Sequence, residues 1–270
     1  MELTTELRSS EGPGHIRASV TEGIGWITLA NPTKHNAVSL SMARSLVECL
    51  REFSNDQAVR CVVIRGEGDR AFCTGSDISE KQDIDTAQAA ENASVILAAQ
   101  RAVRSFSKPI LAMVFGYCLG GGLAIALGCD LRLAGTGASF GIPAAKLGLS
   151  YYYQEMKLLT DLVGPSRCKL MTFTGDRITA DRALQIGLVD DVVPAEQLLS
   201  FVTDLARRIA SNAPLSVAAA KYAVEVALSD AATPDVAGCD ARARACLSSE
   251  DYAEGRRAFR EKRPPRFQGY

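Results

Sequence analysis

The chain has 270 residues, of which 47% are hydrophobic, so it can bury a full core as one large domain or two small ones. Its 30 basic and 31 acidic residues give a net charge of −1, which provides no electrostatic reason to expect nucleic acid or an anionic membrane as a partner. With 2 histidines, and 8 cysteines that form no C-x-x-C pair, the composition argues against a metal centre, a disulfide framework and a Ser-His-Asp triad, and it predicts reduced core thiols in a cytoplasmic protein.

The first part of the chain is predicted to alternate strands and helices after a polar start that lacks the apolar segment of a signal peptide. Alternating polarity around a short turn is typical of a hairpin, and an amphipathic stretch behind Ser39 and Ser41 is typical of a capped helix. In chain order these patterns predict a hairpin of 15–20 and 25–29, a helix from about 39 to 53, a strand at 61–65 and a helix at 87–105.

The run 108–130 is the most informative part of the chain. Residues 110–115 are a short apolar run behind a proline, which predicts a buried strand, and a helical pattern resumes at 123–127. The glycine triplet 120–122 stands between them. A strand, a glycine turn and a helix start leave unpaired backbone N–H groups at the positive end of a helix dipole. Because these donors are fixed before charge appears, such a turn suits a developing oxyanion.

Two other interpretations of this run compete with an oxyanion site. Residues 109–129 carry no charge over 21 positions, which is long enough to cross a bilayer, but five glycines and a leading proline disfavour a membrane span. A glycine turn can also serve only the close packing of a strand on a helix. Residues 120–127 contain no acid or base, so any donors there are expected beside an apolar wall.

The second half of the chain is predicted to complete the sheet and then to become helical. Short apolar runs predict strands at 131–134, 139–140 and 188–193, and amphipathic patterns predict helices at 198–210, 214–228, 233–247 and 251–261. Strands and helices that alternate through two thirds of a chain, followed by helices alone, predict an α/β core with a helical tail.

Motifs along nearly the whole chain resemble those of the crotonase (enoyl-CoA hydratase/isomerase) family. Each motif is weak alone, but many in family order are specific; they include NPTKHNA at 31–37, RAFCTGSDI at 70–78, the glycine triplet, FGIP at 140–143 and the charged segment 249–263. The resemblance implies an α/β fold with a ββα spiral core and an acyl-CoA thioester as substrate in fatty-acid or short-chain acyl-CoA metabolism.

The resemblance also implies that two regions of the chain have different roles. Residues 1–200 correspond to the spiral core with the acyl-CoA site, and residues 201–270 to a C-terminal helical region for trimerisation and closure of the CoA site. A homotrimer or homohexamer is expected, with no nucleic-acid or membrane partner. Coenzyme A is part of the substrate, so no separate cofactor and no metal are expected.

The family's oxyanion hole maps onto the backbone N–H groups of Ser76 and Gly121, so the resemblance and the physical argument agree on the middle glycine. Ser76 alone is also compatible with a turn residue that merely shapes a loop. Lysines at the CoA positions can meet phosphates as point charges or remain solvated. The substrate-binding positions implied by the resemblance are Lys34, His35, Ala37, Asp77, Ile78, Ala124 and Ala144, with Phe259 and Lys262 from a neighbouring subunit.

The chain departs from the family at the positions that decide the chemistry. Hydratases of the family use two glutamates, which map onto Ala124 and Ala144. A general acid or base is worth about 10²–10⁴ in rate. Loss of both therefore argues against hydration, and the alanine at 144 also excludes isomerases that keep the second glutamate alone.

Candidates to replace the glutamates lie at 151–155. The tyrosine of methylmalonyl-CoA decarboxylase maps onto Tyr151, and an aspartate of a dehalogenase and a dienoyl-CoA isomerase maps near Tyr152. The segment 249–263 also resembles that decarboxylase. Loss of CO₂ from a malonyl-type thioester yields the enolate directly, so an oxyanion hole beside an apolar wall suffices. A neutral tyrosine can donate a hydrogen bond to the departing carboxylate.

Three functional hypotheses remain open. The chain is a crotonase-family lyase for which decarboxylation fits best, a hydratase/isomerase with an unconventional acid or base from 151–155, or a non-catalytic acyl-CoA-binding protein. The tyrosines are equally compatible with a packed aromatic cluster at a subunit interface. Glu155 and Asp161, on the following helix, are expected to be solvated or ion-paired.

Overall fold

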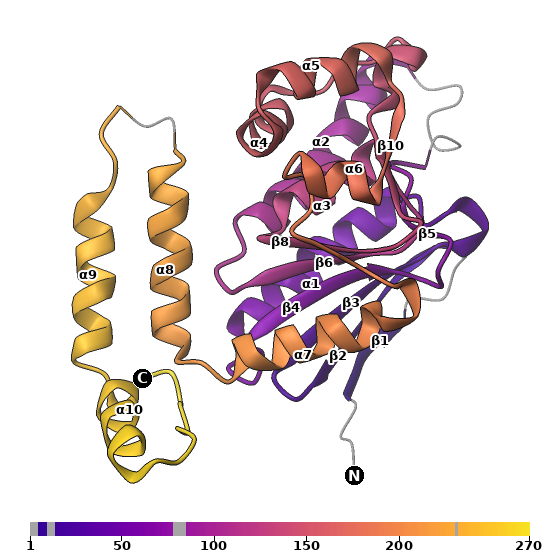
Figure 1. Ribbon diagram of the computed structural model, residues 1–270. Coiled ribbons are helices and arrows are strands. Elements are labelled where there is room, and N and C mark those ends of the chain that lie inside the picture. Colours follow the sequence, from indigo (N-terminus) through magenta and orange to yellow (C-terminus); the bar gives the residue numbers. More distant parts are fainter. Residues whose placement is uncertain (1–4, 10–13, 78–84, 230–231) are drawn as a thin grey trace.

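The computed structural model describes residues 5–9, 14–77, 85–229 and 232–270 and contains two sheets flanked by helices (Figure 1). The larger sheet has seven strands in the order β1-β2-β3-β4-β6-β8-β11, and the smaller has four in the order β10-β9-β7-β5. In the larger sheet the strands are β1 Thr5–Ser9, β2 His15–Thr21, β3 Ile24–Ala30, β4 Cys61–Gly66, β6 Ile110–Val114, β8 Leu131–Gly135 and β11 Asp191–Val193.

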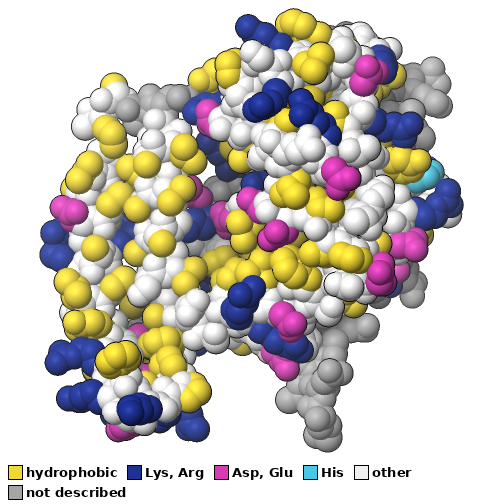
Figure 2. Space-filling model, viewed as in Figure 1, with side chains coloured by type: hydrophobic (Ala, Val, Ile, Leu, Met, Phe, Trp, Pro, Cys, Tyr) yellow, Lys and Arg dark blue, Asp and Glu magenta, His cyan; other side chains and the backbone are white. Residues whose placement is uncertain are grey.

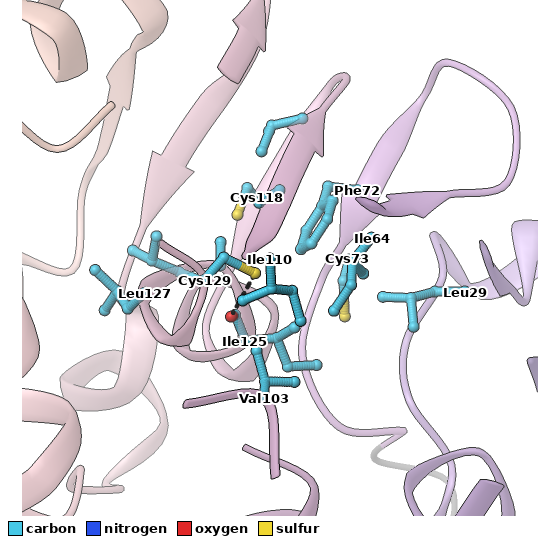
Figure 3. Packing of buried hydrophobic residues seen from close by; sticks show 14 of the residues in the cluster. Leu29, Ile64, Phe72, Cys73, Val103, Ile110, Cys118, Ile125, Leu127 and Cys129 are labelled. Atoms are coloured by element: carbon cyan, nitrogen blue, oxygen red, sulfur yellow. Dashed lines mark hydrogen bonds between the residues drawn. The ribbon is translucent and has the colours of Figure 1, made fainter. Parts of the chain in front are cut away.

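The larger sheet confirms the predicted hairpin and then continues as a parallel sheet. β2 and β3 pair antiparallel, whereas β3, β4, β6, β8 and β11 pair in parallel. Alternate residues of the central strands enter two separate cores. Ile64 and Ile110 pack in the larger core, part of which Figure 3 shows. Val63 and Leu111 pack on the other face against Leu198, the first residue of helix α7 (Leu198–Ala210). Burial of both faces explains the continuous apolar runs in these strands.

The smaller sheet consists of three-residue strands, most of which the sequence patterns did not predict. They are β5 Ala71–Cys73, β7 Tyr117–Leu119, β9 Ser139–Gly141 and β10 Arg177–Thr179. A strand of three residues shows too few alternations to stand out. Residues 109–129, which carry no charge, therefore fold as β6, β7 and the helix α3 (Gly121–Gly128). The glycine triplet 120–122 follows β7 directly. In the described part of the chain no helix is long and apolar enough to cross a membrane.

The helices whose bounds the sequence predicted begin and end within about three residues of the expected positions, whereas the helices at Pro165–Thr174 and Ala180–Gln185 were not predicted. Ser39 caps the first predicted helix, accepting a hydrogen bond from Met42 N at 3.1 Å. Besides α3, the helices are α1 Leu40–Asn55, α2 Thr86–Arg104, α4 Tyr153–Val163, α5 Pro165–Thr174, α6 Ala180–Gln185, α7 Leu198–Ala210, α8 Pro214–Ala227, α9 Val236–Leu247 and α10 Glu250–Glu261.

The C-terminal helices α8 and α9 form an antiparallel pair beside the part of the molecule that contains the sheets, and α10 lies at one end of this pair (Figure 1). Figure 2 shows hydrophobic side chains along these two helices, and Val224, Val236 and Leu247 are all more than half exposed. The expected trimerisation role of this region, the trimer or hexamer itself and the boundary at residue 200 stay predictions.

All eight cysteines are free thiols, and six of them are buried. Cys73, Cys118 and Cys129 lie in the core cluster of Figure 3. Burial raises the pKa of the Cys73 and Cys129 thiols to about 12, which keeps them protonated at neutral pH. The prediction of core thiols is therefore right for these residues, whereas Cys239 and Cys246 on α9 are partly exposed.

Candidate active site

A cavity of about 430 Å³ opens where the loop after β5, the start of α3, the 144–155 segment and helix α2 meet. Larger hollows lie between α8 and the sheet body and against α10, but charged side chains such as Asp130, Lys221 and Glu254 line them. Lys221 pairs with Asp130 at 2.9 Å, so these groups already have partners. We place the site in the smaller cavity, because it contains the glycine turn singled out from the sequence.

Ser76 and Gly121 come together on one wall of this cavity. A Cβ placed on Gly121 would lie 3.5 Å from the Ser76 nitrogen, and one placed on Gly75 would lie 3.3 Å from the Gly121 nitrogen. Gly121 is the first residue of α3, so its N–H has no intrahelical partner. Among the described residues, no oxygen accepts a hydrogen bond from either N–H group. The wall therefore offers two neighbouring backbone donors.

The loop that carries Ser76 is held on both sides. Val38 N donates to Gly75 O at 2.8 Å, and Asp77 N donates to Val38 O at 2.9 Å, which forms an isolated parallel bridge to Ser76. On the other side the Cys73 Sγ accepts a hydrogen bond from Gly75 N at 3.4 Å. Because Gly75 has a φ of +113°, this conformation favours glycine. The donor position is thus fixed by backbone before any ligand binds.

The two alanines at the hydratase glutamate positions have different surroundings. Ala144 lines the cavity, at the start of the short helix Pro143–Leu147. Ala124 is 4% exposed inside α3 and is not one of the cavity-lining residues. The backbone wall around Ser76 and Gly121 therefore has no carboxylate at either position.

Tyr151 joins this cavity from the loop before α4 and packs against the core. Its hydroxyl lies 3.4 Å from where a Cβ on Gly120 would stand, directly beside the glycine turn. Burial and the nearby Glu155 carboxylate raise the pKa of the Tyr151 phenol, so it stays protonated at neutral pH. Tyr152 also lines the cavity but is 55% exposed, and Tyr153 is 67% exposed.

Glu155 corrects an expectation from the sequence. It is half-buried in the cavity wall, where its Oε2 accepts a hydrogen bond from Tyr152 N at 2.9 Å and the Gln100 amide donates to it. Burial outweighs these hydrogen bonds and raises the pKa of the Glu155 carboxyl. The expectation that it is solvated or ion-paired was wrong, whereas Asp161 does pair with Lys157 at 2.8 Å.

Helix α2 forms a wall to which the sequence analysis assigned no role. Its lining residues recur at helical spacing and are Ala89, Asn92, Ala93, Ile96, Leu97 and Gln100. Asn92 is 6% exposed, and its Oδ1 accepts a hydrogen bond from Gln88 Nε2 at 3.2 Å. Asn92 and Gln100 are eight residues apart on one face, and this polar pair in an otherwise apolar stripe is the signal that could have identified the wall.

The residues expected to bind CoA fall into two groups. Asp77 lines the cavity and pairs with Lys34 at 2.6 Å, and Ala37 is buried in the segment that follows this lysine. The His35 ring lies 5.9 Å from the Tyr117 ring. Ile78 lies outside the described residues.

Phe259, which is 86% exposed, and Lys262 lie at the end of α10, away from the cavity in this chain (Figure 1). Their expected contribution from a neighbouring subunit therefore stays a prediction. Among the described residues, no group of three or more His, Cys, Asp and Glu is placed to hold a metal ion.

Comparisons with known proteins all point to one family. The family model described as "Enoyl-CoA hydratase/isomerase" matches residues 19–270. The chain is 32% identical over 263 residues to a short-chain-enoyl-CoA hydratase of Clostridium acetobutylicum, covering 97% of each protein. It is 34% identical over 243 residues to the 2,3-dehydroadipyl-CoA hydratase of Escherichia coli, covering 90% of this chain and 94% of that protein. A solved structure of an enoyl-CoA hydratase/carnithine racemase from Magnetospirillum magneticum matches with a TM-score of 0.91 at 32% identity, covering 98% and 99% of the two chains.

Proposed function

The chain belongs to the enoyl-CoA hydratase/isomerase family of acyl-CoA enzymes, and on this premise we propose that it decarboxylates a malonyl-type CoA thioester. The observation that carries the proposal is the composition of one cavity. It combines the two backbone donors of Ser76 and Gly121 with the neutral phenol of Tyr151, and it has alanine at 144 where a hydratase has a glutamate.

The proposed reaction needs little from side chains. The thioester oxygen accepts hydrogen bonds from Ser76 N and Gly121 N, at about 2.7–3.1 Å. The bond between the α-carbon and the carboxylate breaks, CO₂ leaves, and the electron pair becomes the enolate that these donors stabilise. The enolate carbon then takes up a proton to give the shortened acyl thioester. Tyr151 donates a hydrogen bond to the carboxylate and orients it without adding negative charge.

Glu155 is compatible with this reaction because of its environment. An ionised carboxylate in the same cavity would repel the substrate carboxylate. Burial already raises the pKa of Glu155, and a second carboxylate nearby raises it further, so substrate binding shifts this carboxyl toward its protonated form. A protonated Glu155 can donate a hydrogen bond and does not repel the substrate carboxylate.

A second candidate function is hydration or isomerisation with Glu155 as the acid or base. It is supported by the position of Glu155 in the cavity wall, by its raised pKa and by the names of the similar hydratases. In this case Glu155 takes over the role of the glutamates absent at 124 and 144. The two candidates assign the chemistry to different side chains.

One experiment separates them. Purified protein is incubated with malonyl-, methylmalonyl- and crotonyl-CoA, and the products are measured by mass spectrometry for the wild type, Tyr151→Phe and Glu155→Gln. Decarboxylation predicts turnover of a malonyl-type ester that falls about 10²-fold in Tyr151→Phe. Hydration of crotonyl-CoA abolished by Glu155→Gln supports the second candidate. CoA-ester binding with no turnover of any ester supports a non-catalytic acyl-CoA-binding protein.

A further inference from the structure

One side of the cavity is a groove between helix α2 and the segment that leads into α4. Two hydrogen bonds join these elements at one end of the groove. Gln100 donates one of them to Glu155, and Arg104 donates the other to Gln154. Over residues 89–97 the helix instead lines the open cavity, for eight positions or about 12 Å along its axis. The groove therefore follows the N-terminal half of α2.

The groove is largely apolar. Apart from Asn92, whose Oδ1 already accepts from Gln88, the α2 residues that line it are Ala89, Ala93, Ile96 and Leu97. Leu149 lines the cavity from the segment before α4 and is 58% exposed. The alanines fill little of the space between the two sides. Apolar side chains that remain exposed along a cavity are typical of a surface that an apolar ligand covers.

The charges around the cavity favour the same kind of ligand. The described residues that line it include no lysine, arginine or histidine, and the only charged side chains among them are those of Asp77 and Glu155. Asp77 is already paired with Lys34. A carboxylate at the far end of an acyl group would thus lie in the groove without a cationic partner, which is costly.

From this groove we infer that the acyl group of the substrate carries an apolar tail that lies between α2 and Leu149. The donors Ser76 and Gly121 line the same cavity, so the tail of a bound thioester needs no passage through the protein. A length of about 12 Å corresponds to an extended chain of roughly eight to ten carbons. The inference rests on the proposed function only in taking the cavity as an acyl-CoA site. In a malonyl-type substrate the tail is a substituent on the α-carbon.

Saturated esters test the tail by binding alone, because they have neither a double bond nor a second carboxylate on the α-carbon and undergo neither candidate reaction. Butanoyl-, hexanoyl-, octanoyl- and octanedioyl-CoA are titrated by isothermal titration calorimetry. A fully buried methylene is worth about fourfold in affinity, and a methylene in an open groove about twofold. Octanoyl-CoA should therefore bind at least about 15-fold more tightly than butanoyl-CoA, and octanedioyl-CoA should lose most of this gain. Affinity that does not rise with chain length overturns the inference, as expected if another copy of the chain fills the groove.

Variants assign the gain to the groove. Ala93→Leu fills it and should remove most of the difference between octanoyl- and butanoyl-CoA. Ala98→Leu makes the same change at an exposed position of α2 that does not line the cavity, so it should keep the difference. Leu149→Ser removes the opposite side at an exposed position, where it should reduce the difference without altering the melting temperature.

The outcomes separate the tail from the site. A difference that Ala93→Leu and Leu149→Ser both leave at the wild-type value places the tail elsewhere and overturns the inference. If no ester binds more tightly than free CoA, the acyl-CoA site is wrong and the inference fails with it. Esters that all bind more tightly than free CoA, but equally, overturn the tail and leave the acyl-CoA site intact.

Discussion

The two walls of the cavity are built by different means. The wall of Ser76 and Gly121 consists of backbone, positioned by short strands and glycines, and contains no ionisable side chain apart from Asp77 at its edge. The opposite wall is formed by side chains of α2 together with Tyr151 and Glu155. The hydrogen bonds and charges of these side chains depend on one another. Backbone donors suit any acyl thioester, whereas side chains on helices can be exchanged without disturbing the sheet. In the proposed reaction the first wall stabilises the enolate, and the second wall contacts the rest of the acyl group.

The largest effect is expected where the backbone wall meets the sheet. A Cβ on Gly122 would stand 2.2 Å from the carbonyl oxygen of Cys73, so Gly122→Ala must push α3 away from β5. Overpacking against fixed backbone should destabilise the protein by about 3 kcal/mol or more. Gly128→Ala in the same helix, whose Cβ would meet Val103 Cγ1 at 3.3 Å, is the matched control and should stay near the wild type. Thermal unfolding of both variants measures this, and equal melting temperatures would contradict it.

Removal of one donor should affect the rate more than the fold. Gly121→Pro deletes the N–H at the first position of α3, where proline is well tolerated. We expect the turnover of the acyl-CoA substrate to fall about 10²–10³-fold. Gly121→Ala retains the N–H, and its Cβ would make ordinary contacts at 3.5 Å, so it should keep most of the activity. Similar rates for the proline and alanine variants would remove Gly121 from the chemistry.

The same division explains what the sequence could predict. The glycine triplet, Ser39 as a helix cap and the alternation of strands and helices carry strong local signals, and the structure contains each of them. The three-residue strands β5, β7 and β10 carry almost no pattern, so their existence depends on pairing with distant residues.

The side-chain wall was only partly predictable, for a physical reason. Tyr151 was a candidate because it matches the position of the decarboxylase tyrosine, but Glu155 was expected to be solvated or ion-paired. A helix start shows which residues share a face, not which neighbour covers them. Whether Glu155 is desolvated depends on α2 packing against it, and α2 is separated from it by about fifty positions.

A more modest effect is expected from the thiol behind the backbone wall. The Cys73 Sγ accepts a hydrogen bond from Gly75 N, and Gly75 precedes the donor Ser76. Cys73→Ala should let this loop shift and lower kcat about tenfold with little change in KM, since a displaced donor affects the transition state most. Cys73→Ser, which keeps an acceptor, should restore most of kcat. A change confined to melting temperature would make Cys73 a packing residue.

The smallest effect concerns the charge on the side-chain wall, and its sign is opposite to that of most carboxylates. Because burial raises the pKa of Glu155 in the folded state, the folded protein keeps this proton at pH values where the unfolded chain has lost it. Stability therefore falls as the pH rises from the ordinary value of 4.5 through the raised pKa, and the full penalty is present above that. Glu155→Gln has no charge to desolvate, and its amide oxygen can still accept from Tyr152 N.

We therefore expect Glu155→Gln to melt at a higher temperature than the wild type at pH 7, with a difference that shrinks toward zero below about pH 4. The amide introduced at position 155 can donate to the unpaired oxygen of Gln100 once that side chain turns over, so the Gln100 Nε2 replaces its Oε1 as the unpaired group and the number of such groups does not rise. Asp161→Asn is the control on the same helix: its carboxylate pairs with Lys157, so its loss should not stabilise the protein. A wild type that is the more stable at pH 7 would mean that hydrogen bonds, not burial, dominate at Glu155, and that this wall holds a permanent negative charge unsuited to a malonyl-type substrate.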